Sequence, residues 1–156
     1  TISQIQDIFQ SGETITRSFT LIEGSTAAIF KKKIMANKYL TGTIPDLKEG
    51  IYKPDTYYFK YGYSRIKLLK RMRRAQDKAL KLIWQKKPKK FILKNKNELL
   101  ILASMVQSES NSLKDSRLVA SVFINRLTNN MKLQSDVTLA YGLNINGKEL
   151  TKKCLN

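Results

Sequence analysis

Histidine is absent from the 156-residue sequence, and cysteine occurs once, as Cys154. These shortages exclude an internal disulfide, zinc sites built from cysteine and histidine, and catalytic triads in which histidine is the base. No apolar run reaches the roughly 18 residues that a membrane-spanning helix needs, and the first residues lack the basic-then-apolar order of a signal peptide. Any catalysis must therefore use carboxylates, lysines, tyrosines or hydroxyl groups.

Acidic residues are scarce: 12 aspartates and glutamates stand against 29 lysines and arginines, a net charge of +17. The basic runs at 31–33, 70–74 and 86–90 are compatible with a nucleic-acid-binding surface, or with a surface for acidic lipids or another anionic polymer. A third interpretation is a compositional bias that leaves lysines on solvated helix faces. Lysines outnumber arginines and no run interleaves aromatic residues as single-strand binders do, so we favour the compositional bias.

The first 45 residues predict a small unit of one strand and two helices. A short amphipathic helix ends at Gly12, a strand runs through Leu21, and a second helix begins after Ser25, which we expect to be its N-cap. Residues 39–48 predict a connector. The following segment, 49–59, contains a proline and predicts extended backbone but no central strand.

Three helices are predicted beyond residue 60. The first, 64–86, is basic with a broken apolar stripe and ends before Pro88. The second, 97–110, begins with a capping-box-like pair, Asn95 and Glu98, so we interpret Glu98 as structural. The third covers 113–129. The tail from Met131 shows only turn signals, at Tyr141-Gly142 and Asn146-Gly147.

Glu109 lies between Leu102 and Met105 on the helical wheel of the second helix. A carboxyl group on this apolar face would be buried, and burial raises its pKa above the usual ~4.3. Such a group can donate a proton near neutral pH. The alternative is that Glu109 ends the helix and turns into solvent. Helix position alone does not separate the two.

Arg126 lies within the apolar arc of the third helix, between Val119 and Val122. A buried guanidinium needs acceptors, and the nearest in sequence are Asp136 and the backbone of the following loop. The alternative is an arginine that reaches water from the helix end.

Several linked motifs together resemble the endolytic murein transglycosylase family. Glu23-Gly24 resembles the turn in that family's LysM-like subdomain, and Glu49-Gly50 with 54–57 resembles its second signature. The remaining matches are the segments 102–110, 119–127 and 131–138, with Tyr141-Gly142. The resemblance implies an α+β fold: a partial LysM-like β/α subdomain at 1–45, then a mainly helical catalytic domain at 46–156 whose C-terminal part is missing.

The resemblance also implies an activity. The family is anchored by one N-terminal membrane helix and works on the extracytoplasmic (periplasmic) face of the bacterial cytoplasmic membrane. It is a lyase that cuts the β-1,4 bond between N-acetylmuramic acid and N-acetylglucosamine in nascent peptidoglycan and leaves a 1,6-anhydromuramic end. We therefore expect a chain truncated at both ends, without the membrane helix, that acts on glycan strands. Peptidoglycan synthases are further candidate partners; nucleic acid is not expected.

The family motif places the catalytic acid/base on Glu109, and one glutamate that first donates and then accepts a proton needs no metal and no cofactor. Gln107 stands where many members have a second glutamate, and Val137 where proline is usual. The remaining expected site residues fall into two groups: substrate binding by Ser110, Asn125, Gln134, Asp136, Thr138 and Tyr141, and structural support by Arg126, Glu49 and Asp55.

Three alternatives stay open at this point. In the first, the chain is an inactive, truncated remnant that binds peptidoglycan through its LysM-like part and its basic surface. In the second, it is a nucleic-acid-binding protein, and the set of motifs argues against this alternative. The family's older label, aminodeoxychorismate lyase, implies pyridoxal phosphate, and no lysine context here supports that cofactor.

Overall fold

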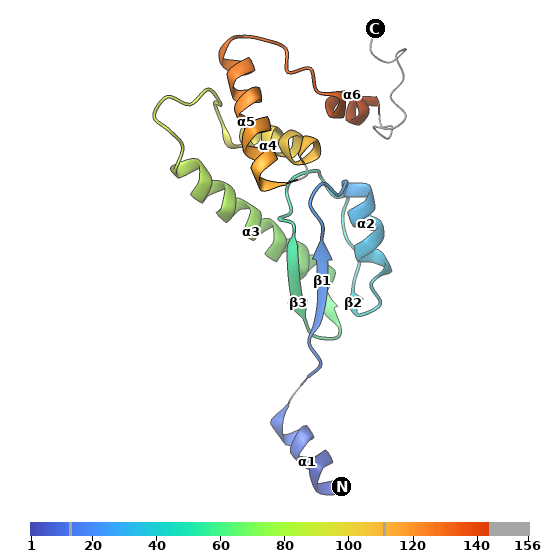
Figure 1. Cartoon of the computed structure of the whole chain (residues 1–156). Helices are drawn as coiled ribbons and strands as arrows, with labels where there is room; N and C mark the ends of the chain where they lie inside the picture. The colour runs from blue at the N-terminus through green and yellow to red at the C-terminus, as the bar shows by residue number, and fades with distance from the viewer. Residues whose placement is uncertain (13, 111, 144–156) are drawn as a thin grey trace. The chain divides into compact units, whose positions relative to one another are not determined.

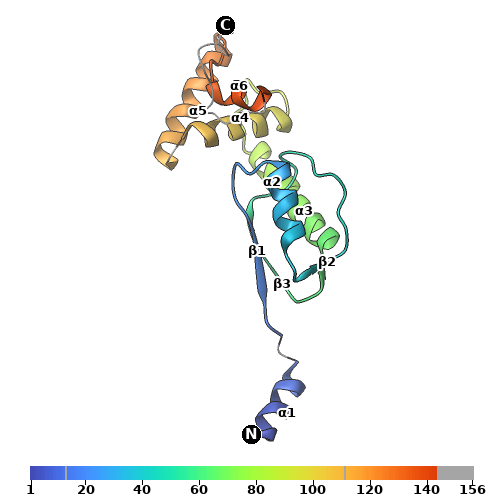
Figure 2. The ribbon, with the colours of Figure 1, turned by 90° about the vertical axis from the view of Figure 1, so that its right-hand side faces the viewer.

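The computed structural model describes residues 1–12, 14–110 and 112–143. The chain divides into two compact units, Thr1–Lys78 and Ala79–Asn156. Helices and short strands confirm the α+β fold (Figures 1 and 2). None of the helices in the described ranges is both long and apolar enough to cross a membrane. In chain order the elements are α1 (Ile2–Ser11), β1 (Arg17–Leu21), α2 (Ala27–Ala36), β2 (Leu40–Thr41), β3 (Asp55–Phe59), β4 (Tyr63–Ser64), α3 (Arg65–Gln85), α4 (Lys96–Glu109), α5 (Leu113–Thr128) and α6 (Asp136–Leu143).

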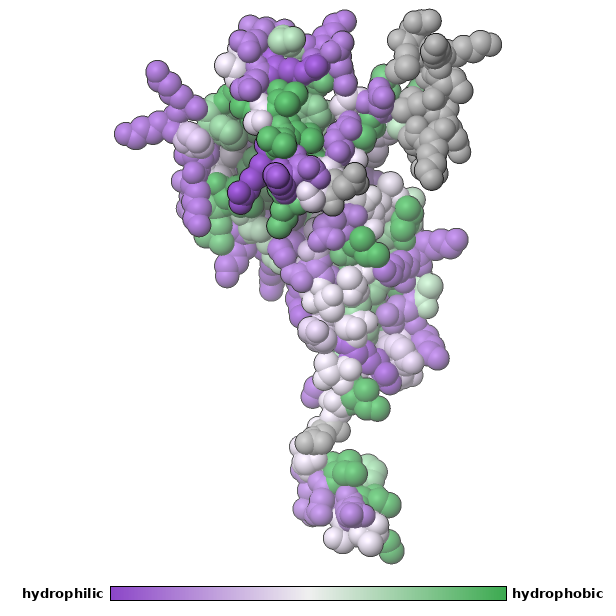
Figure 3. Space-filling model, in the orientation of Figure 1, coloured by the Kyte–Doolittle hydropathy of each residue, from purple (hydrophilic) through white to green (hydrophobic). Residues whose placement is uncertain are grey.

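The predicted N-terminal helix is present as α1, and it ends at Gly12, whose φ of 61° lies in the left-handed region that glycine adopts without strain. No residue of α1 is buried. Its hydrophobic side chains are on the surface, as the green atoms of this helix in Figure 3 show. They are Ile2, Ile5, Ile8 and Phe9.

The sheet of the first unit pairs β1 with β3 in antiparallel register, with Phe19 opposite Tyr57. Side chains alternate along both strands, so that Phe19, Leu21, Tyr57 and Phe59 are buried on one face. On the other face, the hydroxyls of Thr20 and Thr56 lie 2.8 Å apart. A second, two-residue parallel pairing joins β2 to β4.

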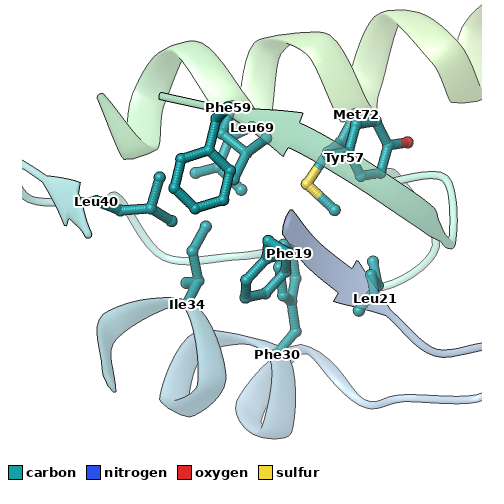
Figure 4. Packing of buried hydrophobic residues seen from close by; sticks show 10 residues of the cluster. Phe19, Leu21, Phe30, Ile34, Leu40, Tyr57, Phe59, Leu69 and Met72 are labelled. Atoms are coloured by element: carbon teal, nitrogen blue, oxygen red, sulfur yellow. The ribbon is translucent and has the colours of Figure 1, made fainter. Parts of the chain in front are cut away.

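Both α2 and α3 contribute to the core that covers the buried face of this sheet (Figure 4). The predicted boundary at residue 45 therefore does not coincide with the boundary between the two compact units, which follows Lys78. The partner strand of β1 and the helix that completes the core both come later in the chain. The buried core residues are Phe19, Leu21, Phe30, Ile34, Leu40, Tyr57, Phe59, Leu68, Leu69 and Met72.

Both ends of α2 are capped by side chains. At its start the N-cap is Thr26, which accepts a hydrogen bond from Ile29 N at 3.3 Å, so the prediction of Ser25 as the cap is wrong by one residue. At its end the guanidinium of Arg65 donates to four carbonyls at 2.8–3.1 Å. These belong to Ile34, Met35, Asn37 and Gly42.

In the second unit, α4 begins as predicted. Asn95 Oδ1 accepts from Glu98 N at 2.9 Å, and the Glu98 carboxylate accepts from Lys94 N at 2.7 Å, which confirms Glu98 as structural. Side chains of α4 and α5 pack around Leu102, Met105 and Phe123.

Helix α6 was not predicted. It includes the Tyr141-Gly142 pair taken as a turn signal, while Asn146-Gly147 lies outside the described residues.

Candidate functional site

Glu109 is the last residue of α4, and its side chain is exposed. Of the two alternatives that the sequence left open, the structure shows the second: Glu109 ends the helix and its side chain reaches solvent. Leu102 and Met105, its neighbours on the wheel, are buried. The helix ends at Glu109, one turn beyond Met105, where the core no longer covers its surface.

One hydroxyl reaches this carboxylate from a distant part of the chain. Ser135, which is only 4% exposed, donates from Oγ to Glu109 Oε1 at 2.7 Å. Thr138 in turn donates to the Ser135 carbonyl, from Oγ1 at 2.7 Å and from its backbone N at 3.2 Å. Ser135 thus connects Glu109 to the first turn of α6. Among the described residues, no group donates to Oε2.

The loop that delivers Ser135 starts with a tight reversal after α5. Asn130 has a left-handed φ of 55°, its N donates to Leu127 O at 3.1 Å, and Met131 N donates to Arg126 O at 2.8 Å. This is the paired hydrogen-bond pattern of a Schellman motif, with asparagine in the position that glycine usually takes. The chain after Met131 therefore turns back toward α5.

Arg126 then holds the returning loop. Its Nη1 donates to the carbonyls of Lys132 and Leu133 at 3.1 and 3.2 Å and to Gln134 Oε1 at 2.7 Å. Of the two acceptors expected for this half-buried guanidinium, the structure provides the loop backbone and not Asp136. Gln134 itself has a left-handed φ of 53°, so the backbone bends sharply just before Ser135.

Ser110 lies next to Glu109 but does not bind it. Its hydroxyl is 2.7 Å from Val106 O and 2.8 Å from the hydroxyl of Ser116, which contacts Ser112 O at 2.9 Å. Ser110 therefore closes the corner between α4 and α5, and the hydroxyl that binds Glu109 is that of Ser135.

The other expected site residues of this unit have different surroundings. Gln134 and Thr138 take part in the loop contacts described above. The side chains of Asn125, Asp136 and Tyr141 are exposed and make no hydrogen bond or ion pair within the described chain. They are free to contact a ligand.

Glu49 and Asp55 belong to the first unit. Glu49 Oε1 accepts from Ala27 N at 2.8 Å, which places a carboxylate at the positive end of α2. Asp55 accepts from Lys53 Nζ and from Thr56 N. The hydrogen bond from Lys53, followed by that from Thr56 N and the Lys53 charge, holds the pKa of Asp55 below its usual range.

Two shallow depressions of the second unit are lined by residues other than Glu109. One shallow depression of about 360 Å³ lies beside Trp84 and Lys94, and another of about 280 Å³ lies between Pro88 and Phe91. Within residues 1–12, 14–110 and 112–143, no three histidine, cysteine, aspartate or glutamate side chains gather in a way that could hold a metal ion. The groups available for chemistry here are the Glu109 carboxyl and the Ser135 hydroxyl that donates a hydrogen bond to it.

Comparison with known proteins agrees with the motifs around this carboxyl. Residues 1–156 match the sequence model of the YceG-like family. The chain belongs to the YceG-like family. Two curated relatives, both named endolytic murein transglycosylase, come from Streptococcus pneumoniae strains R6 and D39; the chain is 38% identical to the first over 93 residues and 37% identical to the second over 97. Each alignment covers 60% of this chain and 16% of the relative.

Ser135 is the residue of this YceG-like chain that sequence reasoning missed. Its neighbours Gln134 and Asp136 were both selected. A serine followed by an aspartate and then Val137, Leu139 and Ala140 is a helix-start signal, which would have predicted α6 and directed attention to the residue that precedes it.

Proposed function

We propose that this chain carries the acid/base of an endolytic murein transglycosylase, and that Glu109 cleaves the glycan strand of peptidoglycan. The contact that supports this most directly is the 2.7 Å hydrogen bond from the buried Ser135 hydroxyl to Glu109 Oε1. It fixes one oxygen of an exposed carboxyl and leaves the other open to a ligand. The family assignment and the names of the two relatives supply the substrate class.

The proposed reaction uses one carboxyl group twice. Protonated Glu109 donates to the bridging oxygen as the bond from muramic C1 to that oxygen breaks. The carboxylate then takes the proton of the muramic C6 hydroxyl as O6 bonds to C1 and closes the 1,6-anhydro ring. No water is consumed. A hydrolase with two carboxylates would need a second acid roughly 5–10 Å away, whereas this route needs none.

The hydrogen bond from Ser135 makes the two carboxyl oxygens of Glu109 inequivalent in the proposed reaction. Because its hydroxyl donates to Oε1, that oxygen serves as the carbonyl oxygen of the acid and as the bonded oxygen of the carboxylate. The transferred proton therefore resides on Oε2. A glycan strand lying across this exposed group would exclude water from the reacting atoms.

The exposed side chains of Asn125, Asp136 and Tyr141 are proposed to bind sugar hydroxyls and N-acetyl groups on either side of Glu109. An extracytoplasmic location, a membrane anchor and synthase partners belong to the same proposal, as properties of a longer parent. So does the assignment of residues 1–45 as a LysM-like subdomain.

Binding without cleavage is the second candidate function. It is favoured by the exposure of Glu109. In that case the chain would hold the glycan strand without cutting it.

The test compares Glu109→Gln with Glu23→Gln, an exposed glutamate of the first unit. Purified murein is incubated with each protein, and anhydromuropeptides are quantified by mass spectrometry after muramidase digestion. Since general acid catalysis contributes about 10²–10⁴-fold, Glu109→Gln should lose at least about 100-fold in rate. Glu23→Gln should match the parent, and both should still sediment with murein.

A second variant, Ser135→Ala, removes the hydroxyl and keeps the carboxyl. A hydrogen bond to a charged group is worth about 1.5 kcal/mol or more, so kcat should fall about tenfold with KM little changed. If Glu109→Gln keeps full activity, the catalytic assignment is wrong. If the parent chain binds murein but releases no anhydromuropeptides, the binding function replaces the enzymatic one.

A further inference from the structure

The positive charge of the chain is concentrated in one short stretch. Residues 65–90 contain twelve lysines and arginines and one acid, Asp77, a net charge of +11 out of +17 for the whole sequence. Much of this stretch is α3, whose opposite side carries the buried residues Leu68, Leu69, Met72 and Gln76. The proposed reaction makes no use of this charge.

Four of these cations form a row along α3. Lys67, Lys70, Arg74 and Lys78 follow one another at intervals of three, four and four residues, which places them within about 80° on the helix surface. All four are exposed. The row, defined by these four residues, extends for about 16 Å at 1.5 Å per residue, with a cation roughly every 5 Å.

Unlike Arg65 and Arg71, the four residues of the row make no hydrogen bond or ion pair with the rest of the described chain. Arg65 binds the carbonyls at the end of α2, and Arg71 donates to Tyr58 O at 2.9 Å. Within the described residues the ion pairs are Lys31 with Asp46 and Lys53 with Asp55, so no acid forms an ion pair with the row, although Asp77 lies one turn from Arg74. Four unpaired cations in single file repel one another, and a linear anion laid along them would relieve that repulsion.

The composition of the row selects the kind of anion. Three of its members are lysines, which bind phosphate as compact point charges. No aromatic residue occurs between Lys67 and Lys78 on which a base could stack. Ile66 is the one exposed large hydrophobic residue of α3 within the first unit, so a membrane-inserting apolar face is lacking.

We propose that the row on α3 binds a linear polyanion with phosphates repeated along an unbranched chain and no bases. The row residues belong to the first unit and Glu109 to the second. A polymer of this kind would hold the protein beside its substrate without entering the reaction.

The test uses long-chain inorganic polyphosphate as the probe and measures its affinity for the full chain at increasing salt. Each phosphate neutralised contributes about 0.7 to the slope of log K against log salt for a single strand. The row therefore accounts for a slope of about −2.8, or about a 50-fold loss between 50 and 200 mM. Glutamine keeps helix propensity close to that of lysine and arginine, so the variant with all four row residues changed to Gln should keep its circular dichroism.

The matched control changes Lys86, Lys87, Lys89 and Lys90 to Gln, which removes the same charge outside the row. For the row variant, we expect the slope of log K against log salt to be shallower than that of the parent by about 2.8. The affinity of the control should stay within about threefold of the parent affinity. The pair Lys70→Gln/Arg74→Gln should lose about half of that slope, and it replaces the fourfold variant if the latter unfolds.

Equal losses in the row variant and the control would overturn the proposal in favour of diffuse charge. Tighter binding of oligothymidylate than of polyphosphate at matched charge would overturn it in favour of nucleic acid. Capture by phosphatidylglycerol vesicles that the row variant loses, with polyphosphate binding unchanged, would overturn it in favour of a membrane surface.

Discussion

Arg65 is expected to stabilise the first unit, although no local sequence pattern indicates this role. Its guanidinium is half-buried and donates four hydrogen bonds of 2.8–3.1 Å to carbonyls at and just beyond the end of α2. The last carbonyls of a helix have no partner within the helix, and a cation beside them also interacts favourably with the helix dipole. Replacing Arg65 with Met keeps the apolar stem but removes both effects.

The size of the loss follows from these contacts. Hydrogen bonds from a charged donor contribute about 1.5–3 kcal/mol to stability, and the dipole interaction adds about 0.3–1 kcal/mol. Water can replace part of the bonding at a half-buried site, so we expect Arg65→Met to lower the free energy of unfolding by about 2–3 kcal/mol. Arg65→Lys keeps the charge but not the planar fork, and should lose about half as much.

The chain supplies its own internal control for this measurement. Six of the seven tyrosines lie in the first unit, while Trp84, the single tryptophan, lies in the second. Urea unfolding followed by tyrosine near-ultraviolet circular dichroism should show the loss, and Trp84 fluorescence should shift less. An Arg65→Lys variant as stable as the parent, or an Arg65→Met loss below about 0.5 kcal/mol, would refute this account of the α2 terminus.

Two further predictions concern particular backbone and charge states. Because Asn130 has φ 55° at the end of α5, Asn130→Gly should preserve stability, whereas Asn130→Ala should lower the free energy of unfolding by about 1 kcal/mol. The urea midpoints of the two variants measure this difference, and equal midpoints would contradict the left-handed conformation of Asn130. The pKa of Asp55 is lowered from 3.8, mainly by the Lys53 hydrogen bond, so its stabilisation is present above about pH 4 and is lost as pH falls through its folded-state pKa. On acidification, the Asp55→Asn variant should lose less stability than the parent. Identical profiles of stability against pH would mean that the contact between Lys53 and Asp55 has no thermodynamic effect.

Local patterns predicted the features that depend on neighbouring residues. The Asn95 and Glu98 capping pair fixed the start of α4, and alternation around Phe19 marked β1. Both signals operate within a few residues, which is the range over which helix and strand periodicity act.

Features that depend on distant residues could not be predicted in this way. The carbonyls that Arg65 binds precede it by 23 to 31 residues, and Ser135 follows Glu109 by 26. A helical wheel identified the side of α4 on which Glu109 lies. It carried no information on whether another element covers the last turn, so it could not decide between a buried and an exposed Glu109. The Glu109 motif itself came from family resemblance, which is why the carboxyl was selected and its buried hydroxyl partner was not.

The loop between α5 and α6 has no spare length. Met131 is bonded to Arg126 O, the carbonyls of Lys132 and Leu133 are bonded to the Arg126 guanidinium, and Ser135 is bonded to Glu109. One inserted residue would displace Ser135 by about 3.8 Å along the chain, beyond the reach of the carboxylate. The exposed side chain of Lys132 can therefore vary freely, but the number of residues from Arg126 to Ser135 cannot, and insertions or deletions there should be as damaging as loss of the serine itself.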